Sequence, residues 1–223
     1  MNQSLDFSRY DQKLEFILRT SARIFAAKGF HSTSMRDIAR ATRVSLAGLY
    51  YYCKSKDELL FLIQDNCFGR VLERLQERLK ETDEPTARLR LVIENHLSFF
   101  AANMAEMKVL SHEAESLGGE MYAQVAGKKQ QYTKLVRRIL ADVQARQTTT
   151  QKIDLTVATY ALFGMMNWIY NWYDPRGKLS VNQLVDNITR LFLNGFLSSS
   201  SKSFSSPSSR PTEKISVWRT ASR

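Results

Sequence analysis

The sequence predicts an all-α protein with a small N-terminal head of three helices and a larger helical body, about nine helices in all. Apolar side chains recur every three or four residues through most of the 223 residues, and the alternation typical of strands is nearly absent. Hydrophobic residues make up 43% of the chain, which is enough to build a core. Glycine, proline and threonine breaks divide this pattern into separate helices.

Charge is distributed unevenly and supports the same division. Residues 1–56 hold ten Lys and Arg against four Asp and Glu, which gives +6. Residues 57–197 hold seventeen of each and are neutral, and residues 198–223 hold five against one, which completes the total of +10. A basic head on a neutral body indicates a module that binds a polyanion, carried by a second domain.

Cysteine content and hydropathy indicate a cytoplasmic protein. The chain has two cysteines, Cys53 and Cys67, so a disulfide framework is not expected. The N-terminus lacks the apolar stretch and cleavage site of a secretory signal, and no apolar run is long enough to span a bilayer.

The first helix of the head is predicted from one apolar face and ends at Gly29. Its anchors are Leu14, Ile17, Leu18, Ser21, Ile24 and Phe25. Gly29 is expected to adopt a left-handed conformation. Ser34 with Asp37 three residues later resembles a capping box and predicts a short helix over residues 35–41.

A second short helix is predicted after a tight turn at residues 42–44. Ser45 caps it, and it covers residues 46–52. Ser55 then caps a long helix that begins with lysine and two acids. Two short helices joined by a turn and supported by a third match a helix-turn-helix, whose second helix fits the major groove of DNA.

The body is predicted to contain six helices followed by a tail. The helices are expected over residues 56–81, 85–104, 106–117, 120–147, 153–173 and 181–197. Eleven of the 26 residues from Ser198 on are serine, so residues 198–223 are expected to be a disordered basic tail. The tail either adds non-specific affinity for polyanions or is inert.

The head resembles the DNA-binding domain of the TetR/AcrR family of one-component regulators. The similar segment, residues 17–60, reads ILRTSARIFAAKGFHSTSMRDIARATRVSLAGLYYYCKSKDELL. The matching positions are Ile17, Phe25, Lys28, Gly29, Phe30, Ser34, Arg36, Ile38, Ala39, Val44, Ser45, Leu49, Tyr50, Lys54, Lys56, Leu59 and Leu60. Chain length, the N-terminal position of the head and the helical remainder are similar as well.

This resemblance implies a set of DNA contacts in the head. They are Ser34, Arg36, Arg43, Ser45, Leu46, Ala47, Gly48, Tyr50, Tyr51, Tyr52, Lys54 and Lys56. Arg36 is expected to contact a base edge, with a solvated surface charge as the alternative. Tyr50 and Tyr52 are expected to reach phosphates beside Lys56, unless Tyr51 or Tyr52 instead covers the core of the head.

The chain departs from the family pattern in three ways. Arg43 stands where the turn usually has glycine, so it must avoid or tolerate positive φ, and a phosphate contact would offset the cost. The segment Leu46-Ala47-Gly48 lacks the usual lysine or threonine; Gly48 either allows close approach to DNA or is simply small. Cys53 replaces an aromatic residue and is either a redox sensor or a small buried side chain, and we favour the second.

The last two predicted helices are apolar on nearly all sides, which indicates burial against both the body and a partner. By resemblance they form a homodimer interface. Its predicted residues are Met166, Trp168, Ile169, Trp172, Leu184, Ile188, Leu191 and Phe192. Two heads would then bind a palindromic operator on double-stranded DNA. The alternative is a purely intramolecular core.

The middle helices carry aromatic and methionine side chains with a few polar groups, as a small-molecule pocket does. Its predicted residues are His96, Phe99, Phe100, Met104, Met107, His112, Glu113, Tyr122, Tyr132, Tyr160, Phe163 and Asn167. Ordinary core packing is the alternative. The histidines and Glu113 form no metal motif, so we expect no metal and no cofactor. No phosphate loop, nucleophile elbow or catalytic dyad is present, so we do not expect an enzyme.

Residues 161–180 and 45–52 resemble the branch of the family that represses fatty-acid and sterol-ring degradation and senses acyl-CoA. Arg137, Arg138 and Arg176 are cations available to a CoA phosphate. The sequence therefore predicts a homodimeric repressor released from its operator by a small hydrophobic ligand such as acyl-CoA, without membrane contact. The alternative is a DNA-binding protein whose body docks a protein partner and senses no ligand.

Overall fold

The structure, a computed structural model, describes residues 3–113, 115–146 and 152–196, in which helices are joined by turns and loops and no strand occurs. It contains nine α-helices and two 3₁₀ segments there. They are α1 (Gln3–Lys28), α2 (Met35–Thr42), α3 (Leu46–Tyr52), α4 (Lys56–Arg78), η1 (Leu79–Glu81), α5 (Pro85–Ala102), α6 (Met104–His112), α7 (Gly119–Ala145), α8 (Leu155–Asn167), η2 (Trp168–Asn171) and α9 (Val181–Phe196).

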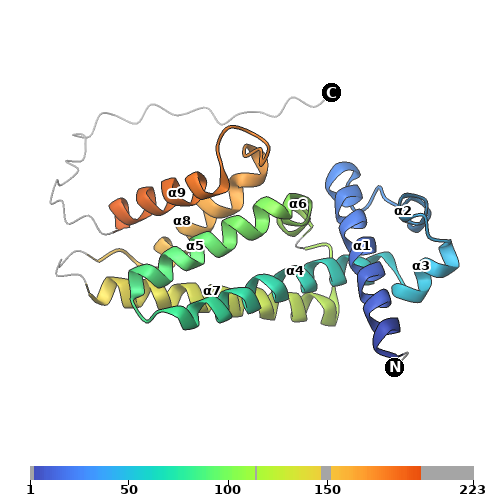
Figure 1. The fold of residues 1–223 in the computed structure, drawn as a ribbon, viewed down its shortest axis with the longest axis horizontal. Helices are drawn as coiled ribbons and strands as arrows, with labels where there is room; N and C mark the ends of the chain where they lie inside the picture. The colour runs from blue at the N-terminus through green and yellow to red at the C-terminus, as the bar shows by residue number, and fades with distance from the viewer. Residues whose placement is uncertain (1–2, 114, 147–151, 197–223) are drawn as a thin grey trace, which may run out of the picture.

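The head forms one end of an elongated molecule. Figure 1 shows α1 standing across the axis of the body, with α2 and α3 on its far side. Helix α4 runs from the head into the body beside α7. The predicted all-α fold class is therefore confirmed, and the two short helices project away from the body.

The core of the head is built around fully buried side chains from each of its helices. Ile17 of α1, Ile38 of α2 and Leu49 of α3 are completely enclosed. The same cluster includes Leu59, Leu60 and Ile63 of α4 and reaches Val109, Leu117 and Val125 in the body. The head is therefore packed against α6 and α7 and is not joined to the body by a flexible linker alone.

The body is organised around α5, which contacts α4, α7, α8 and α9. Its side chains Leu89, Ile93 and Leu97 are completely buried in the large apolar cluster of the body. Glu84 caps α5 by accepting hydrogen bonds from Thr86 N at 3.0 Å and from Ala87 N at 2.5 Å. Pro85 occupies the first turn, where its missing N–H costs nothing.

Two predicted helices end earlier than expected. The segment predicted over residues 106–117 starts at Met104 and ends at His112, because Glu113 uses its backbone and side chain in the following turn, where Ser116 Oγ donates to Glu113 Oε2 at 2.7 Å. The segment predicted over residues 153–173 is divided. Asp154 caps α8, which ends at Asn167, and η2 continues with Ile169 buried.

No helix in the described segments is both long and apolar enough to cross a membrane. Likewise, no three of His, Cys, Asp and Glu in those segments lie close enough to hold a metal ion. The predicted tail, residues 198–223, lies outside the described residues.

Candidate nucleic-acid interface and ligand pocket

The N-terminus of α2 is fixed by a complete capping box. Asp37 N donates to Ser34 Oγ at 3.2 Å, and Ser34 N donates to Asp37 Oδ2 at 3.0 Å. Lys28 Nζ donates to the same carboxylate oxygen at 3.0 Å. These hydrogen bonds, those from Ser34 first, lower the pKa of Asp37. The exposed Ser34 and Arg36 are consequently presented from a well-defined first turn.

The turn between α2 and α3 places a non-glycine residue in a left-handed backbone conformation, which is energetically unfavourable. Arg43 lies in the left-handed region, with φ of 52° and ψ of 38°, and its guanidinium side chain is exposed. Its N–H donates to Arg40 O at 3.3 Å, and Val44 N donates to Ala39 O at 3.1 Å. Arg43 therefore tolerates positive φ, and it does so at the outer corner of the helix-turn-helix.

Helix α3 is anchored by one residue and exposes most of the others. Leu49 is completely buried, whereas Ala47 and Tyr50 are exposed and Leu46 is half-buried. Ser45 Oγ accepts a hydrogen bond from Gly48 N at 3.0 Å. A Cβ atom at Gly48 would lie 3.0 Å from both Ser45 Oγ and Val44 Cγ1, so a larger residue here would require these side chains to shift.

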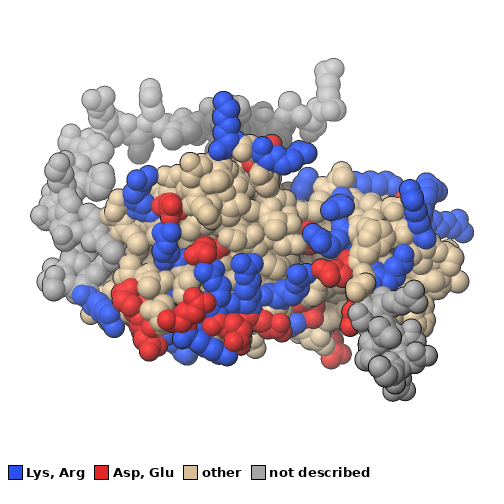
Figure 2. Space-filling view, in the orientation of Figure 1, with Lys and Arg blue, Asp and Glu red and all other residues tan. Residues whose placement is uncertain are grey.

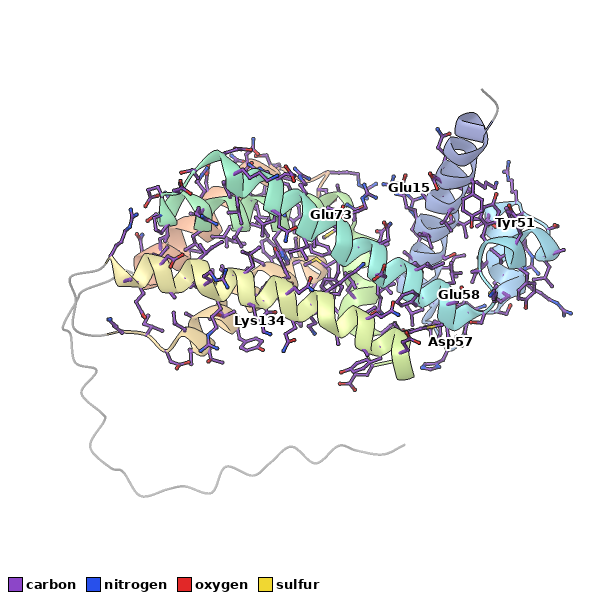
Figure 3. All side chains as sticks on the ribbon, turned by 90° about the horizontal axis from the view of Figure 1, so that it is seen from below. Glu15, Tyr51, Asp57, Glu58, Glu73 and Lys134 are labelled. Carbon is purple, nitrogen blue, oxygen red and sulfur yellow. The ribbon has the colours of Figure 1, made fainter. Side chains whose placement is uncertain are left out.

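The three consecutive tyrosines have different surroundings. Tyr51 is the most exposed at 72%, and it lies on the side of α1 away from the body (Figure 3). Tyr50 is 46% exposed. Tyr52 is half-buried, and its ring stacks on Tyr10 of α1 with centroids 4.9 Å apart. Burial thus favours the interpretation in which the Tyr52 ring covers the core of the head, while Tyr50 and Tyr51 face solvent.

Lys56, predicted to lie beside a DNA phosphate, has protein partners in this structure. Its ammonium donates to Phe30 O at 2.8 Å, to Thr33 O at 2.9 Å and to His31 O at 3.3 Å. It also lies 4.4 Å from the centre of the Phe30 ring. All three N–H bonds have acceptors, so none is left for a phosphate. Lys56 instead ties the start of α4 to the loop between α1 and α2.

Exposed cations remain at the edge formed by the short helices. Arg36, Arg40, Arg43 and Lys54 are all exposed. Figure 2 shows Lys and Arg over this end of the molecule with few acidic neighbours, whereas Lys and Arg alternate with Asp and Glu over the body. This edge is therefore the surface with the strongest physical case for contacting a polyanion.

Cys53 follows α3 and is buried. Burial raises the pKa of its thiol to about 11, and Sγ lies 3.6 Å from Leu49 O. A thiol that is protonated and enclosed is a poor redox sensor, so the interpretation as a small buried side chain is favoured.

The body contains a cavity of about 410 Å³ between α5, α6, α7, α8 and η2. Seven predicted pocket residues line it: His96, Phe100, Met107, Tyr132, Tyr160, Phe163 and Asn167. Eight further residues line the cavity that were not predicted from the sequence: Phe68, Leu110, Ser111, Lys129, Thr133, Gly164, Trp168 and Tyr170. Leu110 and Ser111 could have been predicted from helical spacing, because they follow the predicted pocket residue Met107 by three and four residues and lie on the same face of the helix.

Five predicted pocket residues do not line this cavity. Phe99 is buried against Phe100, with ring centroids 5.2 Å apart, and Met104 is half-buried against the body core. Tyr122 is 48% exposed on α7. His112 is exposed and contacts the edge of the cavity residue Tyr170, with centroids 5.5 Å apart. Glu113, the fifth, points toward the head.

Glu113 connects the body to the head directly. Its Oε1 accepts a hydrogen bond from Phe30 N at 3.2 Å, in the loop that Lys56 also binds. Gln64 of α4 donates to the backbone oxygen of Glu113 at 2.9 Å. Ser111, two residues earlier, lines the cavity. One end of α6 therefore contacts both the cavity and the loop that carries α2.

His96 and Tyr132 are the buried polar pair of the cavity. His96 Nδ1 lies 3.1 Å from Tyr132 Oη, and the two rings are stacked. Burial lowers the pKa of His96 to about 3, with Asn167 opposing the shift, and burial raises the pKa of Tyr132. Both groups are therefore uncharged at neutral pH.

The predicted dimer interface needs correction. Five of its residues are buried inside the protomer, where they cannot also face a second copy: Met166, Ile169, Leu184, Ile188 and Phe192. The alternative of an intramolecular core describes these five, because α8 packs against α7 and α5, and α9 packs against α5. The other three are exposed: Trp168 at 61%, Trp172 at 54% and Leu191 at 67%.

Comparison with known proteins gives the family. The bacterial regulatory proteins of the tetR family match residues 17–63, and the tetracyclin repressor-like C-terminal domain matches residues 82–196. The buried α4 residues of the head cluster likewise end at Ile63.

Individual relatives are similar over most of their length. The fatty acid metabolism regulator protein of Bacillus subtilis is 22% identical over 80% of this chain and 93% of its own. The transcriptional repressor KstR2 of Mycolicibacterium smegmatis is 23% identical over 82% of this chain and 90% of its own. A crystal structure of AibR with isovaleryl coenzyme A and operator DNA is 28% identical over 80% of this chain and 97% of that one, with a TM-score of 0.72.

The two matched segments together cover the head and nearly all of the described body, and the C-terminal one alone spans more than half of the 223 residues. The helix-turn-helix, the basic edge and the cavity-bearing body agree with that match. This chain belongs to the TetR family of DNA-binding transcriptional regulators.

Proposed function

We propose that this protein is a homodimeric repressor that binds a palindromic operator and releases it when a hydrophobic ligand, an acyl-CoA thioester, enters the body cavity. The observation that carries this proposal is the position of α6. Its residues Met107, Leu110 and Ser111 line the cavity, and Glu113 at its end accepts a hydrogen bond from the head.

The DNA surface is the outer edge of α2 and α3. Helix α3 enters the major groove with Leu46, Ala47 and Gly48 toward the bases, and Arg36 contacts a base edge from α2. The phosphate contacts are those of the remaining exposed groups: Ser34, Arg43, Ser45, Tyr50, Tyr51 and Lys54. Tyr52 positions α3 through its stacking on Tyr10, and Lys56 positions the preceding loop.

The dimer face is the exposed apolar side of α8 and η2 with one residue of α9. It comprises Val157, Tyr160, Trp168, Trp172 and Leu191, each more than half exposed. Isolated apolar residues are common on surfaces, but a row of large ones at helical spacing indicates a protein contact. Two copies joined there would present two heads to half-sites about one DNA turn apart, or wider in a long operator.

Release follows from a population shift. The ligand favours the arrangement of α6 that accommodates it, and the bond from Glu113 to Phe30 passes that preference to the loop before α2. The resulting spacing of the heads no longer fits two successive grooves. The size of the effect is limited by the difference in ligand affinity between the two arrangements.

The ligand class is supported by the cavity and by the relatives. A volume of about 410 Å³ lies within the range of small-molecule pockets, about 300–1,000 Å³, and aromatic and aliphatic side chains line most of it. AibR binds isovaleryl coenzyme A, and another relative regulates fatty acid metabolism. These features favour ligand sensing over the alternative of a body that docks a protein partner.

The remaining assignments follow from this role. Residues 1–56 are the DNA-binding domain, and residues 57–197 are the ligand-binding and dimerisation domain. The family comprises regulators, and we assign this chain no enzymatic activity and no cofactor. A bacterial operator-binding protein acts where the chromosome is, so we place it in the cytoplasm.

Selection of bound fragments from random DNA, followed by operator binding with and without acyl-CoA, tests the proposal. We expect an inverted repeat bound at least about a thousandfold more tightly than random DNA, and weaker binding when isovaleryl- or octanoyl-CoA is added. Monomeric protein without preference for any inverted repeat would overturn it, and unchanged operator affinity would reject this ligand class.

The same selection tests the assignment of Arg36. Replacing Arg36 with alanine removes a base contact, so we expect preference to relax at one base pair, at a cost of about 1–3 kcal/mol. Arg40→Ala, which removes an exposed cation from the same helix, is the matched control and should leave the preferred sequence unchanged. If Arg36→Ala weakens every sequence equally, Arg36 contacts phosphate.

A further inference from the structure

Three polar side chains, from α5, α7 and α8, lie in contact along one wall of the body cavity. Tyr132 of α7 contacts His96 of α5, and His96 in turn interacts with Asn167 at the end of α8. All three line the cavity. We propose that His96 and Asn167 together donate hydrogen bonds to the carbonyl oxygen of the ligand, with Tyr132 fixing the orientation of His96. This inference rests on the proposed function and names the group that the cavity recognises.

The tautomer of His96 follows from its neighbours. Tyr132 is buried, 3% exposed, and His96 Nδ1 is the hydrogen-bond partner of its hydroxyl at 3.1 Å. If Nδ1 carried the proton, the hydroxyl hydrogen would be left without an acceptor among the described residues. The arrangement with fewer unpaired groups has Tyr132 donating to Nδ1, and the neutral ring then carries its proton on Nε2.

Nε2 makes no hydrogen bond of normal geometry within the described residues, and Asn167 is the polar side chain that interacts with this ring. His96 is 3% exposed, and its Nε2 atom is buried. A buried donor left unpaired costs about 1–3 kcal/mol, so such groups in native proteins usually serve a ligand or a water. Asn167 beside it is exposed on the cavity side of α8 and can supply a second N–H.

The surroundings favour an uncharged acceptor over a carboxylate. Phe100 and Phe163 contact His96, with ring centroids 4.7 Å and 6.2 Å away, so the site is apolar. Burial keeps His96 neutral, and an anion placed beside it would lose hydration without gaining a counter-charge. Among the described residues that line the cavity, Lys129 is the one cation, and it is exposed at the rim.

This arrangement divides a thioester ligand into three parts. The acyl chain lies against Met107, Phe100 and Phe163, and the carbonyl oxygen lies between His96 and Asn167. A cavity of about 410 Å³ is too small to enclose the nucleotide of coenzyme A as well. The nucleotide therefore lies outside, past the exposed rim residue Lys129. The cavity should prefer thioesters to the corresponding free acids.

Calorimetric titration of the full-length protein tests this assignment. The probes are isovaleryl- and octanoyl-CoA, the free acids, and the S-alkyl thioether of whichever CoA ester binds more tightly, which differs from it by the carbonyl oxygen. We expect the wild type to bind the thioester at least about tenfold more tightly than the thioether, because the thioether loses the hydrogen bonds from both His96 and Asn167. Equal affinity for the two overturns the inference even though ligand sensing stands.

Substitutions in the cavity test which residues cause the preference for the thioester over the thioether. His96→Leu should bind thioester and thioether alike, and Asn167→Leu, at an exposed position where misfolding is not expected, should reduce the ratio. Thr133→Val removes another polar group that lines the same cavity and should keep the wild-type ratio. If His96→Leu and Asn167→Leu both keep the wild-type preference for the thioester, the assignment is wrong. If the wild type binds no CoA ester at all, the proposed ligand class fails and the inference fails with it.

Discussion

The head and the body are both packed helices, but different interactions define them. In the head, short helices are fixed by side-chain caps and by polar ties such as those of Ser34, Ser45 and Lys56. In the body, long helices pack through an apolar cluster around α5, and the polar pair His96–Tyr132 is uncharged. The head therefore presents charge outward at fixed positions, whereas the body retains a cavity into which an apolar ligand fits. A surface that reads a polyanion and a pocket that senses a small molecule need these opposite properties.

We expect the largest effects from truncating a buried leucine in the core of the head or in the core of the body. Leu49 of α3 and Leu97 of α5 are both completely buried. Replacing either with alanine leaves a cavity and should cost about 2–5 kcal/mol of the free energy of unfolding, measured in urea. Leu49→Ala should also abolish operator binding, because α3 loses its anchor in the head.

Leu97→Ala provides the comparison. Under conditions where this variant is still folded, we expect its operator affinity without ligand to stay near that of the wild type. Loss of operator binding equal to that of Leu49→Ala would contradict the separation, and would mean that the shared contacts through α6 and α7 unite head and body in one cooperative unit.

The second prediction concerns two lysines two residues apart. Lys56→Met removes hydrogen bonds to three carbonyl oxygens and should destabilise the head by roughly 1.5–3 kcal/mol. The slope of operator affinity against salt concentration should stay unchanged, because Lys56 contacts no phosphate. Hydrogen exchange in the loop between α1 and α2 and salt titration of DNA binding measure the two effects.

Lys54→Met is the matched control. Its side chain is exposed, so we expect a change in unfolding free energy within about 0.5 kcal/mol. The salt slope should fall by about one, as for the loss of one phosphate contact. The opposite result, with a reduced slope for Lys56→Met, would restore Lys56 as a phosphate contact.

The third prediction uses pH to probe the body. The pKa of His96 is about 3 in the folded protein, compared with 6.5 for a solvated histidine in the unfolded chain. Between pH 3 and pH 6.5 the unfolded chain therefore binds one more proton than the folded protein does. Stability therefore falls as pH decreases through this window, by about 1.4 kcal/mol per pH unit, or about 2 kcal/mol at pH 5. Urea unfolding at pH 7 and pH 5 measures it.

His96→Gln should remove most of this dependence. His112→Gln, which changes an exposed histidine, should keep it. A wild-type stability that is the same at pH 7 and pH 5 would mean that His96 is not buried as a neutral group, and the contrast between a charged head and an uncharged cavity would weaken.

The sequence predicts features that depend on neighbouring residues and misses those that depend on distant ones. The caps at Ser34 and Ser45 join groups three residues apart, so the motif itself reveals them. The bond from Glu113 to Phe30 joins residues 83 positions apart, and Lys56 reaches an acceptor 26 positions away. No local pattern indicates either contact.

The body shows the same limit in another form. Apolar side chains on nearly all sides of a helix indicate burial, but they do not tell which side faces the core and which a partner. Met166 and Trp168 are only two residues apart, yet Met166 is completely buried and Trp168 is 61% exposed. Pocket residues such as Tyr132 and Asn167 were found because polar groups among aromatics are unusual, whereas the apolar wall residue Leu110 gave no such signal.

The smallest expected effect concerns Arg43, where the local strain of the head and its proposed function meet. A left-handed residue with a Cβ atom costs about 1–2 kcal/mol, and glycine removes that cost while adding about 0.5–1 kcal/mol of unfolded-state entropy. Arg43→Gly should therefore stabilise the head slightly, by about 0.5 kcal/mol, yet weaken operator binding and lower its salt slope by about one.

Arg43→Ala and Arg43→Asn separate strain from charge. All three variants lack the guanidinium, so their affinity for the operator should decrease to the same extent. Only their stabilities should differ: alanine keeps the left-handed strain, whereas asparagine tolerates that conformation and should approach glycine. If Arg43→Gly binds the operator as tightly as the wild type at every salt concentration, the arginine makes no phosphate contact. The strained turn would then have no functional compensation, because the stabilised variant would keep full DNA binding.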